Sequence, residues 1–313
     1  MEFSFNPDLL LGELSQTRIT ELLQTEGLRI ATGPFVFRIT SPLPEIARGL
    51  RILYEQFPLA DGSGFADFHV RISRPAGIRR FLRPQSIFDV DGVMPFKPLP
   101  GKQSLALMEW GMNWCIYTHA HQFLTIHGAV LERNGRALLL PAPSGSGKST
   151  LCAALMCSGW RLLSDELILI SPESGAIRPL CRPVSLKNAS IDVLKRYAPD
   201  AVLTEPIPDT SKGTVALMRP SALSVQSAAI DALPWRVVFP RYLAGSATNL
   251  TPMKQAEVFM KLVENAFNYS VLGRLGFDTM AALVSRLEGF TAEYGALDDI
   301  IATLNEWVSE GER

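Results

Sequence analysis

The chain has 313 residues, 47% of them hydrophobic, with 30 basic and 31 acidic residues and a formal net charge of −1. Its length and apolar content are sufficient for one large domain or two domains. The balanced charge provides no basic excess for nucleic acid and no polybasic patch for a membrane surface.

Further sequence features predict a cytoplasmic protein. No apolar run reaches the length of about eighteen residues that a membrane-spanning helix needs. The N-terminal segment lacks the basic region and apolar core of a signal peptide. The four cysteines show no C-x-x-C spacing, which favours free thiols in a reducing compartment over a zinc site or disulfides. We therefore expect neither a membrane nor a nucleic-acid partner.

The first hundred residues predict a small α+β domain. Apolar spacing predicts one or two short helices in residues 8–26 and a helix over Leu43–Phe57. Alternating or apolar runs predict strands at 28–30, 35–39 and 68–72, with further strand-like pieces in 86–96. The Pro-Gly pair at 100–101 marks a break. The predicted domains are residues 1–100 and residues 101–313.

The next segment predicts a helix and a hairpin. Residues Leu105–His121 are apolar and aromatic and indicate a long core helix. Residues Phe123–Leu131 then predict a single strand. The Asn134-Gly135 pair is a strong hairpin signal, leading directly to the apolar strand Arg136–Leu140.

The stretch at 141–150, PAPSGSGKST, lies between that strand and a predicted helix over Leu151–Cys157. A strand, a glycine-rich turn and a helix form a phosphate-binding P-loop, in which backbone N–H groups and the helix N-terminus receive an anion. Lysine adds a positive charge, and a serine hydroxyl suits Mg²⁺. The predicted nucleotide-binding residues are Pro143, Ser144, Gly145, Ser146, Gly147, Lys148, Ser149 and Thr150.

Two acids interrupt the apolar run Trp160–Ile170, which otherwise predicts one strand. A buried carboxylate without a partner is costly, so Asp165 and Glu166 indicate a nearby cation. We expect Ser149, Asp165 and Glu166 to hold Mg²⁺. The alternative is an acidic pair that faces solvent at a bulge in the strand.

The remaining chain predicts further helices and strands around a Pro-rich, mobile loop at 198–212. The expected helices are 185–197, 251–267, 277–287 and 297–308, and the expected strands are 215–218 and 235–239. A cation opposite the γ-phosphate would stabilise phosphoryl transfer, whereas a solvated surface cation is the alternative for each candidate. The candidates are Arg182, Lys187, Lys212 and Arg241, of which Arg241 and Lys212 come first for testing.

Three segments together resemble the HPr kinase/phosphorylase family: Ile126-His-Gly, the glycine-rich stretch, and the sequence GWRLLSDE at 159–166. The chain departs from the family pattern at Ala142, where the family has glycine, and at Glu166, where it has a second aspartate. Four later pieces, SLKN at 185–188, KGTVA at 212–216, FPRY at 239–242 and NAFNY at 265–269, resemble the HprK-related kinase A group. The matching residues are His127, Gly128, Ser144, Gly145, Gly147, Lys148, Ser149 and Asp165.

The resemblance implies an α/β fold with a P-loop kinase core of the HPr kinase/phosphoenolpyruvate carboxykinase type. It implies transfer of the ATP γ-phosphoryl group to a hydroxyl, with Asp165 as base, Lys148 on the phosphates and His127 as an orienting residue. The expected cofactors are ATP and Mg²⁺, and the expected acceptor is a serine of a peptide or small protein. The family forms rings, so a homo-oligomer is also expected. The alternatives are a small-molecule kinase, acting for example on free serine, and a nucleotide-binding regulatory module.

Overall fold

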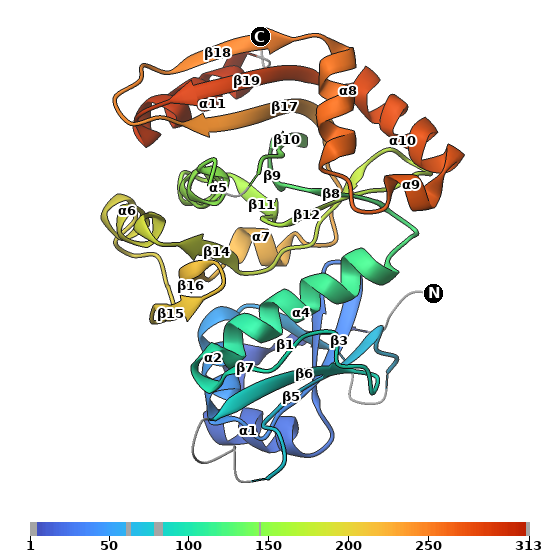
Figure 1. Cartoon of the computed structure of the whole chain (residues 1–313), viewed down its shortest axis with the longest axis vertical. Helices are drawn as coiled ribbons and strands as arrows, with labels where there is room; N and C mark the ends of the chain where they lie inside the picture. The colour runs from blue at the N-terminus through green and yellow to red at the C-terminus, as the bar shows by residue number, and fades with distance from the viewer. Residues whose placement is uncertain (1–4, 61–63, 78–83, 144, 311–313) are drawn as a thin grey trace.

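The computed structural model describes residues 5–60, 64–77, 84–143 and 145–310. It has a mixed α/β fold with four sheets among these residues, so the α/β class predicted from the sequence is confirmed (Figure 1). Within the described ranges, no helix is both long enough and apolar enough to cross a bilayer. The cytoplasmic location and the homo-oligomeric state stay predictions.

The N-terminal part forms a seven-stranded sheet in the order β1-β4-β2-β3-β5-β6-β7. Its strands are β1 (Phe5–Leu10), β2 (Leu28–Thr32), β3 (Phe35–Thr40), β4 (Pro58–Ala60), β5 (Phe68–Ser73), β6 (Gln85–Val90) and β7 (Leu99–Pro100). The helices are α1 (Gln16–Gln24) and α2 (Pro44–Leu53), with short 3-10 turns at Leu11–Glu13 and Gly101–Gln103. Ile46, Leu50 and Leu53 of α2 are fully buried, because the helical repeat places them on one face.

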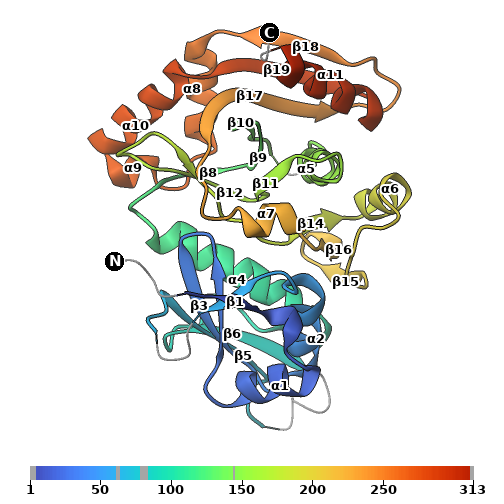
Figure 2. The ribbon, with the colours of Figure 1, turned by 180° about the vertical axis from the view of Figure 1, so that it is seen from behind.

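Helix α4 (Ser104–His119) confirms the long helix expected in this region. It packs against α2, β5 and β6. Figures 1 and 2 show α4 lying between the seven-stranded sheet and the rest of the chain. The predicted division at residue 100 stays a prediction.

The C-terminal part contains three sheets. The largest has the order β11-β9-β10-β17-β19-β18, and the smaller ones have the orders β13-β12-β8 and β14-β16-β15. The strands are β8 (Leu124–His127), β9 (Ala129–Arg133), β10 (Arg136–Leu140), β11 (Arg161–Ser164), β12 (Leu167–Ile170), β13 (Ile177–Arg178), β14 (Val184–Lys187), β15 (Ile207–Thr210), β16 (Gly213–Met218), β17 (Leu233–Tyr242), β18 (Asn249–Met253) and β19 (Glu288–Tyr294). The helices are α5 (Lys148–Cys157), α6 (Ala189–Tyr197), α7 (Ala222–Gln226), α8 (Gln255–Glu264), α9 (Tyr269–Leu272), α10 (Arg274–Ser285) and α11 (Leu297–Glu310).

Two predicted single strands each divide between two sheets. The run 123–131 breaks at Gly128, and the run 160–170 breaks at Asp165 and Glu166. Strands β8 and β12 pair in one small sheet, whereas β9 and β11 pair in the large sheet. The two breaks face each other, since the N–H of Gly128 donates to the carbonyl of Glu166 at 3.2 Å. The acids therefore lie where the chain passes from one sheet to another.

Other expectations were wrong in local detail. The expected helix 185–197 begins only after strand β14, and the expected helix 251–267 begins only after strand β18. Strand β15 lies in the segment predicted to be a mobile loop. The Asn134-Gly135 hairpin is confirmed: both residues have positive φ, and β9 and β10 pair antiparallel.

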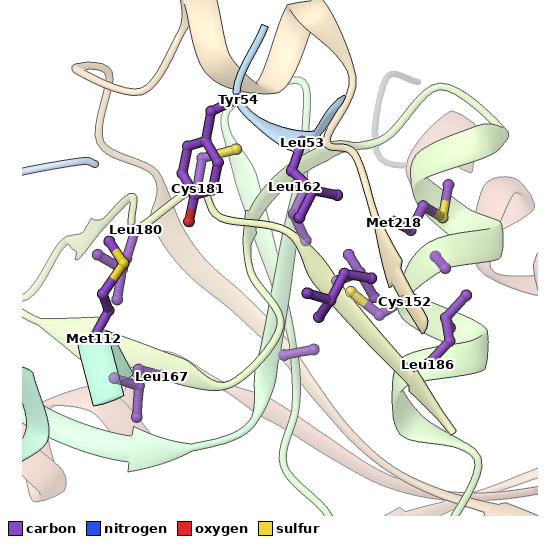
Figure 3. Close-up of a cluster of buried hydrophobic side chains, with 14 of the residues drawn as sticks. Leu53, Tyr54, Met112, Cys152, Leu162, Leu167, Leu180, Cys181, Leu186 and Met218 are labelled. Atoms are coloured by element: carbon purple, nitrogen blue, oxygen red, sulfur yellow. The ribbon is translucent and has the colours of Figure 1, made fainter. Parts of the chain in front are cut away.

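One hydrophobic core joins the N-terminal part to the C-terminal part. Figure 3 shows Leu53 and Tyr54 of the N-terminal part in one buried cluster with Cys181 and Leu162. A buried ion pair lies beside this cluster. Arg182 donates to Glu109 Oε2 at 2.5 Å, and Tyr54 donates to Glu109 Oε1 at 2.7 Å. Arg182 thereby ties α4 to the segment that precedes β14.

We expect Arg182→Met to lower the free energy of unfolding by about 3–5 kcal/mol, because it leaves the buried carboxylate of Glu109 without a cation. The double variant Glu109→Leu/Arg182→Met removes both charges and is expected to recover most of the loss. Urea denaturation followed by circular dichroism measures both. The control is Arg274→Met in an exposed pair with Asp278, where a change within about 0.5 kcal/mol is expected. Equal losses in the control and in Arg182→Met would contradict the expected cost.

Candidate active site

The glycine-rich turn is supported by two strand ends that the sequence analysis missed. Gly147 has a φ of 91°, and a Cβ there would lie 2.8 Å from Tyr294 Oη, so glycine is required at this position. The N–H of Tyr242 donates to the carbonyl of Ser146 at 3.0 Å. Tyr242 ends β17 and Tyr294 ends β19. Helix α5 begins directly after the turn, so its N-terminus faces the same space.

Alanine is accommodated where the usual P-loop has its first glycine. Ala142 is buried and does not belong to the described residues with positive φ. A side chain therefore fits without the strain that a left-handed backbone would impose. The predicted residue Ser144 lies outside the described residues.

Lys148 and Asp165 meet beside this turn. The Nζ of Lys148 lies 3.6 Å from Asp165 Oδ1 and donates to the carbonyl of Asp165 at 2.5 Å. The N–H of Ser185 donates to Asp165 Oδ2 at 3.1 Å. Asp165 Oδ1 is buried and has no hydrogen-bond partner, which leaves one carboxylate oxygen able to accept a further bond. Burial lowers the pKa of Lys148, but the charges of Asp165 and Glu166 outweigh it and raise the pKa above its usual value.

Glu166 and His127 form a second pair, next to the first. His127 Nδ1 lies 3.2 Å from the carbonyl of Glu166 and 3.6 Å from Glu166 Oε2. Both neighbours accept hydrogen bonds, so Nδ1 carries the ring proton and Nε2 is free to accept one. Burial raises the pKa of Glu166, but the charges of Lys148, Lys187 and Lys212 outweigh it and lower the pKa below its usual value.

Gly128 allows this arrangement. A Cβ at Gly128 would lie 2.9 Å from Ile168 Cδ1 and 3.0 Å from Pro141 Cα. The turn between β8 and β9 therefore approaches the end of β10 more closely than a side chain would permit. This contact brings His127 to the same edge as the glycine-rich turn.

A pocket of about 630 Å³ opens over the glycine-rich turn, Lys148 and the pair of His127 and Glu166. Its wall includes every described residue of the predicted nucleotide-binding set, together with His127 and Glu166. Ser185, Lys187, Tyr242 and Tyr294 also line it. Asp165 does not line this pocket, but its carboxylate lies 3.6 Å from the Nζ of Lys148, which does. The structure thus brings the described nucleotide-binding residues, His127 and Glu166 together around one cavity of a size typical for small-molecule ligands, whereas Asp165 and Arg241 do not line it.

The candidate cations are placed differently from one another. Lys187 lines the pocket, and Lys212 lies over the ring of Trp110 with its Nζ 5.0 Å from the centroid. Arg182 forms a buried ion pair with Glu109. Arg241 is exposed, lies 3.6 Å from Glu293 Oε2 and does not line the pocket. Its side chain points away because neighbouring side chains on a strand alternate, and its neighbour Tyr242 lines the pocket instead.

The donor set around the turn fits Mg²⁺ only in part. Mg²⁺ takes six oxygen ligands and is usually held by one or two carboxylates together with substrate phosphates. The unpartnered Asp165 Oδ1 and the carboxylate of Glu166 supply suitable oxygens, and Ser149 lines the same pocket. No group of three or more acidic, histidine or cysteine side chains suited to a metal occurs in the described ranges. Phosphate oxygens would have to complete the coordination.

His127 predicts a pH dependence of stability. Burial and the charge of Lys148 lower its pKa from the ordinary value of 6.5, against the opposing effect of Glu166. As the pH falls below 6.5, the unfolded chain therefore binds this proton before the folded chain does, and stability decreases. We expect His127→Gln to reduce the loss of stability between pH 8 and pH 5, measured from urea midpoints. The control is His121→Gln at an exposed histidine, and equal losses in the wild type and His127→Gln would contradict the prediction.

Comparisons with known proteins agree with the sequence resemblance. The family model described as SynChlorMet cassette protein ScmC matches residues 99–180, which is well under half of the chain. The HPr kinase/phosphorylases of Streptococcus thermophilus strains LMD-9 and CNRZ 1066 are each 22% identical over 185 residues. These matches cover 57% of this chain and 50% of each relative, so the chain spans about half the length of the curated relatives it matches.

A solved structure was also found, the Hpr(Ser) kinase/phosphatase from Coxiella burnetii. It is 12% identical, and the match covers 60% of this chain and 93% of that chain with a TM-score of 0.26. At this TM-score the likeness carries no argument about the fold. The HprK-related kinase A assignment stays a prediction. Over 57% of its length, the chain is similar to HPr kinase/phosphorylases.

Proposed function

We propose that the protein is an ATP-dependent kinase that transfers the γ-phosphoryl group to a hydroxyl. The observation that carries this proposal is the contact between Lys148, which lines the glycine-lined pocket, and the buried Asp165 beside it, with 3.6 Å between Nζ and Oδ1. Phosphoryl transfer needs mainly positioned cations and a base near the transferred group, and both are at hand here. The curated relatives named HPr kinase/phosphorylase support the same reaction class.

Each residue has a role in the proposed reaction. The amides of the turn and the N-terminus of α5 hold the phosphates. The ammonium of Lys148 moves from Asp165 to the phosphates and neutralises part of their charge. Asp165 then accepts the proton of the acceptor hydroxyl. The acceptor oxygen forms its bond to the γ-phosphorus as the bond to the β–γ bridging oxygen breaks, and ADP leaves. Mg²⁺, when held by Ser149 with Asp165 or Glu166, would neutralise further phosphate charge.

Lys187 and Lys212 are the cations proposed to face the transferred group. Both act electrostatically on Glu166, which lies in the pocket wall. Burial lowers the pKa of Lys212, and the charges of Lys187 and Lys148 lower it further. The charge of Glu166 raises this pKa but does not outweigh them. Mutually repelling cations favour an anion between them. They are better placed for this role than Arg241, which pairs with Glu293 at the surface.

The proposed acceptor is a serine of a peptide or small protein. The curated relatives are named as kinases of a protein, HPr. This name favours a hydroxyl on a protein over a hydroxyl on a metabolite as the acceptor. Since the chain matches only half of their length, the acceptor need not be the same.

Incubation with γ-labelled ATP and Mg²⁺ in a cell extract tests this proposal. Label on a peptide or protein is the expected result, and α-labelled ATP should leave no label there. Label on a small molecule would instead indicate a metabolite kinase. Binding of ATP with no transfer to any acceptor would contradict the kinase and favour a regulatory module.

A further inference from the structure

A second pocket of about 450 Å³ adjoins the glycine-lined pocket. His127 and Glu166 line both pockets, so the two cavities meet at these side chains. Apart from His127, Glu166 and Lys212, the residues of this second pocket have no role in the proposed reaction. Its walls are aromatic and come from α4, from the segment before β7 and from the segment after α8. The rings are Phe96, Trp110, Trp114, Tyr117 and Phe267.

Ring contacts hold this wall in place. Tyr117 and Phe267 are stacked with centroids 4.6 Å apart and planes 11° apart. The ring of Phe267 is also edge-on to His127, at 5.9 Å. Phe96 and Trp114 pack edge-on at 6.0 Å. Such ring pairs add stability beyond the burial of their apolar surface. The packed rings therefore form one continuous aromatic surface that begins at His127.

The pocket also carries a positive charge. Lys212 lines it and lies over the ring of Trp110, with its Nζ 5.0 Å from the ring centroid. The Nε1–H of Trp110 is fully buried, so it offers no donor to a ligand in the pocket. The pocket is therefore suited to an apolar group that is attached to a carbonyl or carboxylate oxygen.

We propose that this pocket holds the apolar or aromatic side chain of the residue next to the phosphorylated hydroxyl in a peptide acceptor. The inference rests on the proposed kinase function. A peptide supplies three features at once: a hydroxyl for the groups near Glu166, a neighbouring apolar side chain for the rings, and backbone carbonyl oxygens for the ammonium of Lys212. Free serine carries no group for the aromatic walls.

The rim of the pocket allows a chain to continue outward. Lys97 and Ser211 at the rim are exposed, and Phe267 is 41% exposed. A peptide seated with one side chain among the rings could therefore leave the pocket on either side. The same exposure makes Phe267 the wall residue whose removal disturbs the fold least.

Peptides with a central serine test the proposal. One flanking residue, on either side of the serine, is varied among Phe, Leu, Ala and Lys, and kcat/KM is measured for the full chain. We expect Phe or Leu on one side to be favoured over Ala by about tenfold or more, the usual discrimination of an apolar pocket. Phe267→Ala should reduce this preference to about twofold. The matched control is Phe277→Ala, which removes a 52% exposed ring outside the pocket and should keep the wild-type preference.

The outcomes separate this inference from the proposed function. If wild-type protein fails to bind Mg-ATP without peptide, the kinase proposal itself has failed. If ATP binds and serine peptides are phosphorylated with no preference for the flanking residue, only the pocket assignment is overturned. Faster phosphorylation of free aromatic alcohols than of every peptide would also overturn it. Should Phe267→Ala lose its fold, Phe267→Leu keeps an apolar side chain and is expected to lower the preference for Phe over Ala by about twofold or more.

Discussion

Asp165→Asn is expected to lower the rate of phosphoryl transfer by about two to four orders of magnitude, the usual contribution of a general base. Asparagine has nearly the same shape, and its carbonyl oxygen can still accept the bond from the N–H of Ser185. The donation from Lys148 to the backbone carbonyl of residue 165 also remains. The loss should therefore appear in kcat, with Mg-ATP still bound. Single-turnover assays and calorimetric titration with a non-hydrolysable ATP analogue measure the two quantities.

Glu166→Gln is the matched control for this change. Glu166 neighbours Asp165 in sequence, lines the pocket with a side chain that is 18% exposed, and has its carboxylate 3.6 Å from His127. If Asp165 is the base, the kcat of Glu166→Gln should exceed that of Asp165→Asn by at least about tenfold. A near-normal rate in Asp165→Asn together with a large loss in Glu166→Gln would move the base role to Glu166.

Lys148→Ala is expected to abolish ATP turnover, with a loss of about a thousandfold or more in kcat/KM, because the ammonium at the start of α5 disappears. The side chain of Lys148 is 7% exposed and faces a carboxylate that is 2% exposed. Removal of the cation alone therefore also destabilises the fold, by up to about 3–5 kcal/mol. Turnover of ATP and thermal unfolding should be measured on the same preparation.

The double variant Lys148→Ala/Asp165→Asn separates the two effects. Without either charge, the fold should recover most of its stability while ATP turnover stays absent. Wild-type turnover in a folded Lys148→Ala protein would contradict the assignment of the phosphate site. A fold that is equally unstable in the single and double variants would contradict the ion-pair account of its stability.

The local signals at the turn could be read from the sequence because single residues determine them. Gly147 needs a positive φ, Asn134-Gly135 needs two, and the apolar run before the turn requires a buried strand. These features depend on a few neighbouring residues. The two acids in an apolar run predict a nearby cation, and the structure places Lys148 Nζ 3.6 Å from Asp165 Oδ1.

The breaks at Gly128 and at Asp165 could not be read in the same way. An apolar run looks the same whether it stays in one sheet or passes between two, because both halves are buried. Strand β19 was not predicted, because its alternation of apolar and polar residues is short and begins soon after helix α10. The roles of Tyr242 and Tyr294 depend on where the ends of β17 and β19 lie in space. No local pattern identifies such positions.

The proposed kinase function depends on one arrangement, a triphosphate on the glycine-rich turn with the carboxylate of Asp165 beside it. A crystal structure with Mg²⁺ and a non-hydrolysable ATP analogue tests it most directly. We predict phosphates bound by the backbone N–H groups at 145–149 and by Lys148, with Mg²⁺ held between Ser149 and Asp165 or Glu166. A nucleotide bound elsewhere, with Lys148 still on Asp165 and the turn empty, would contradict it.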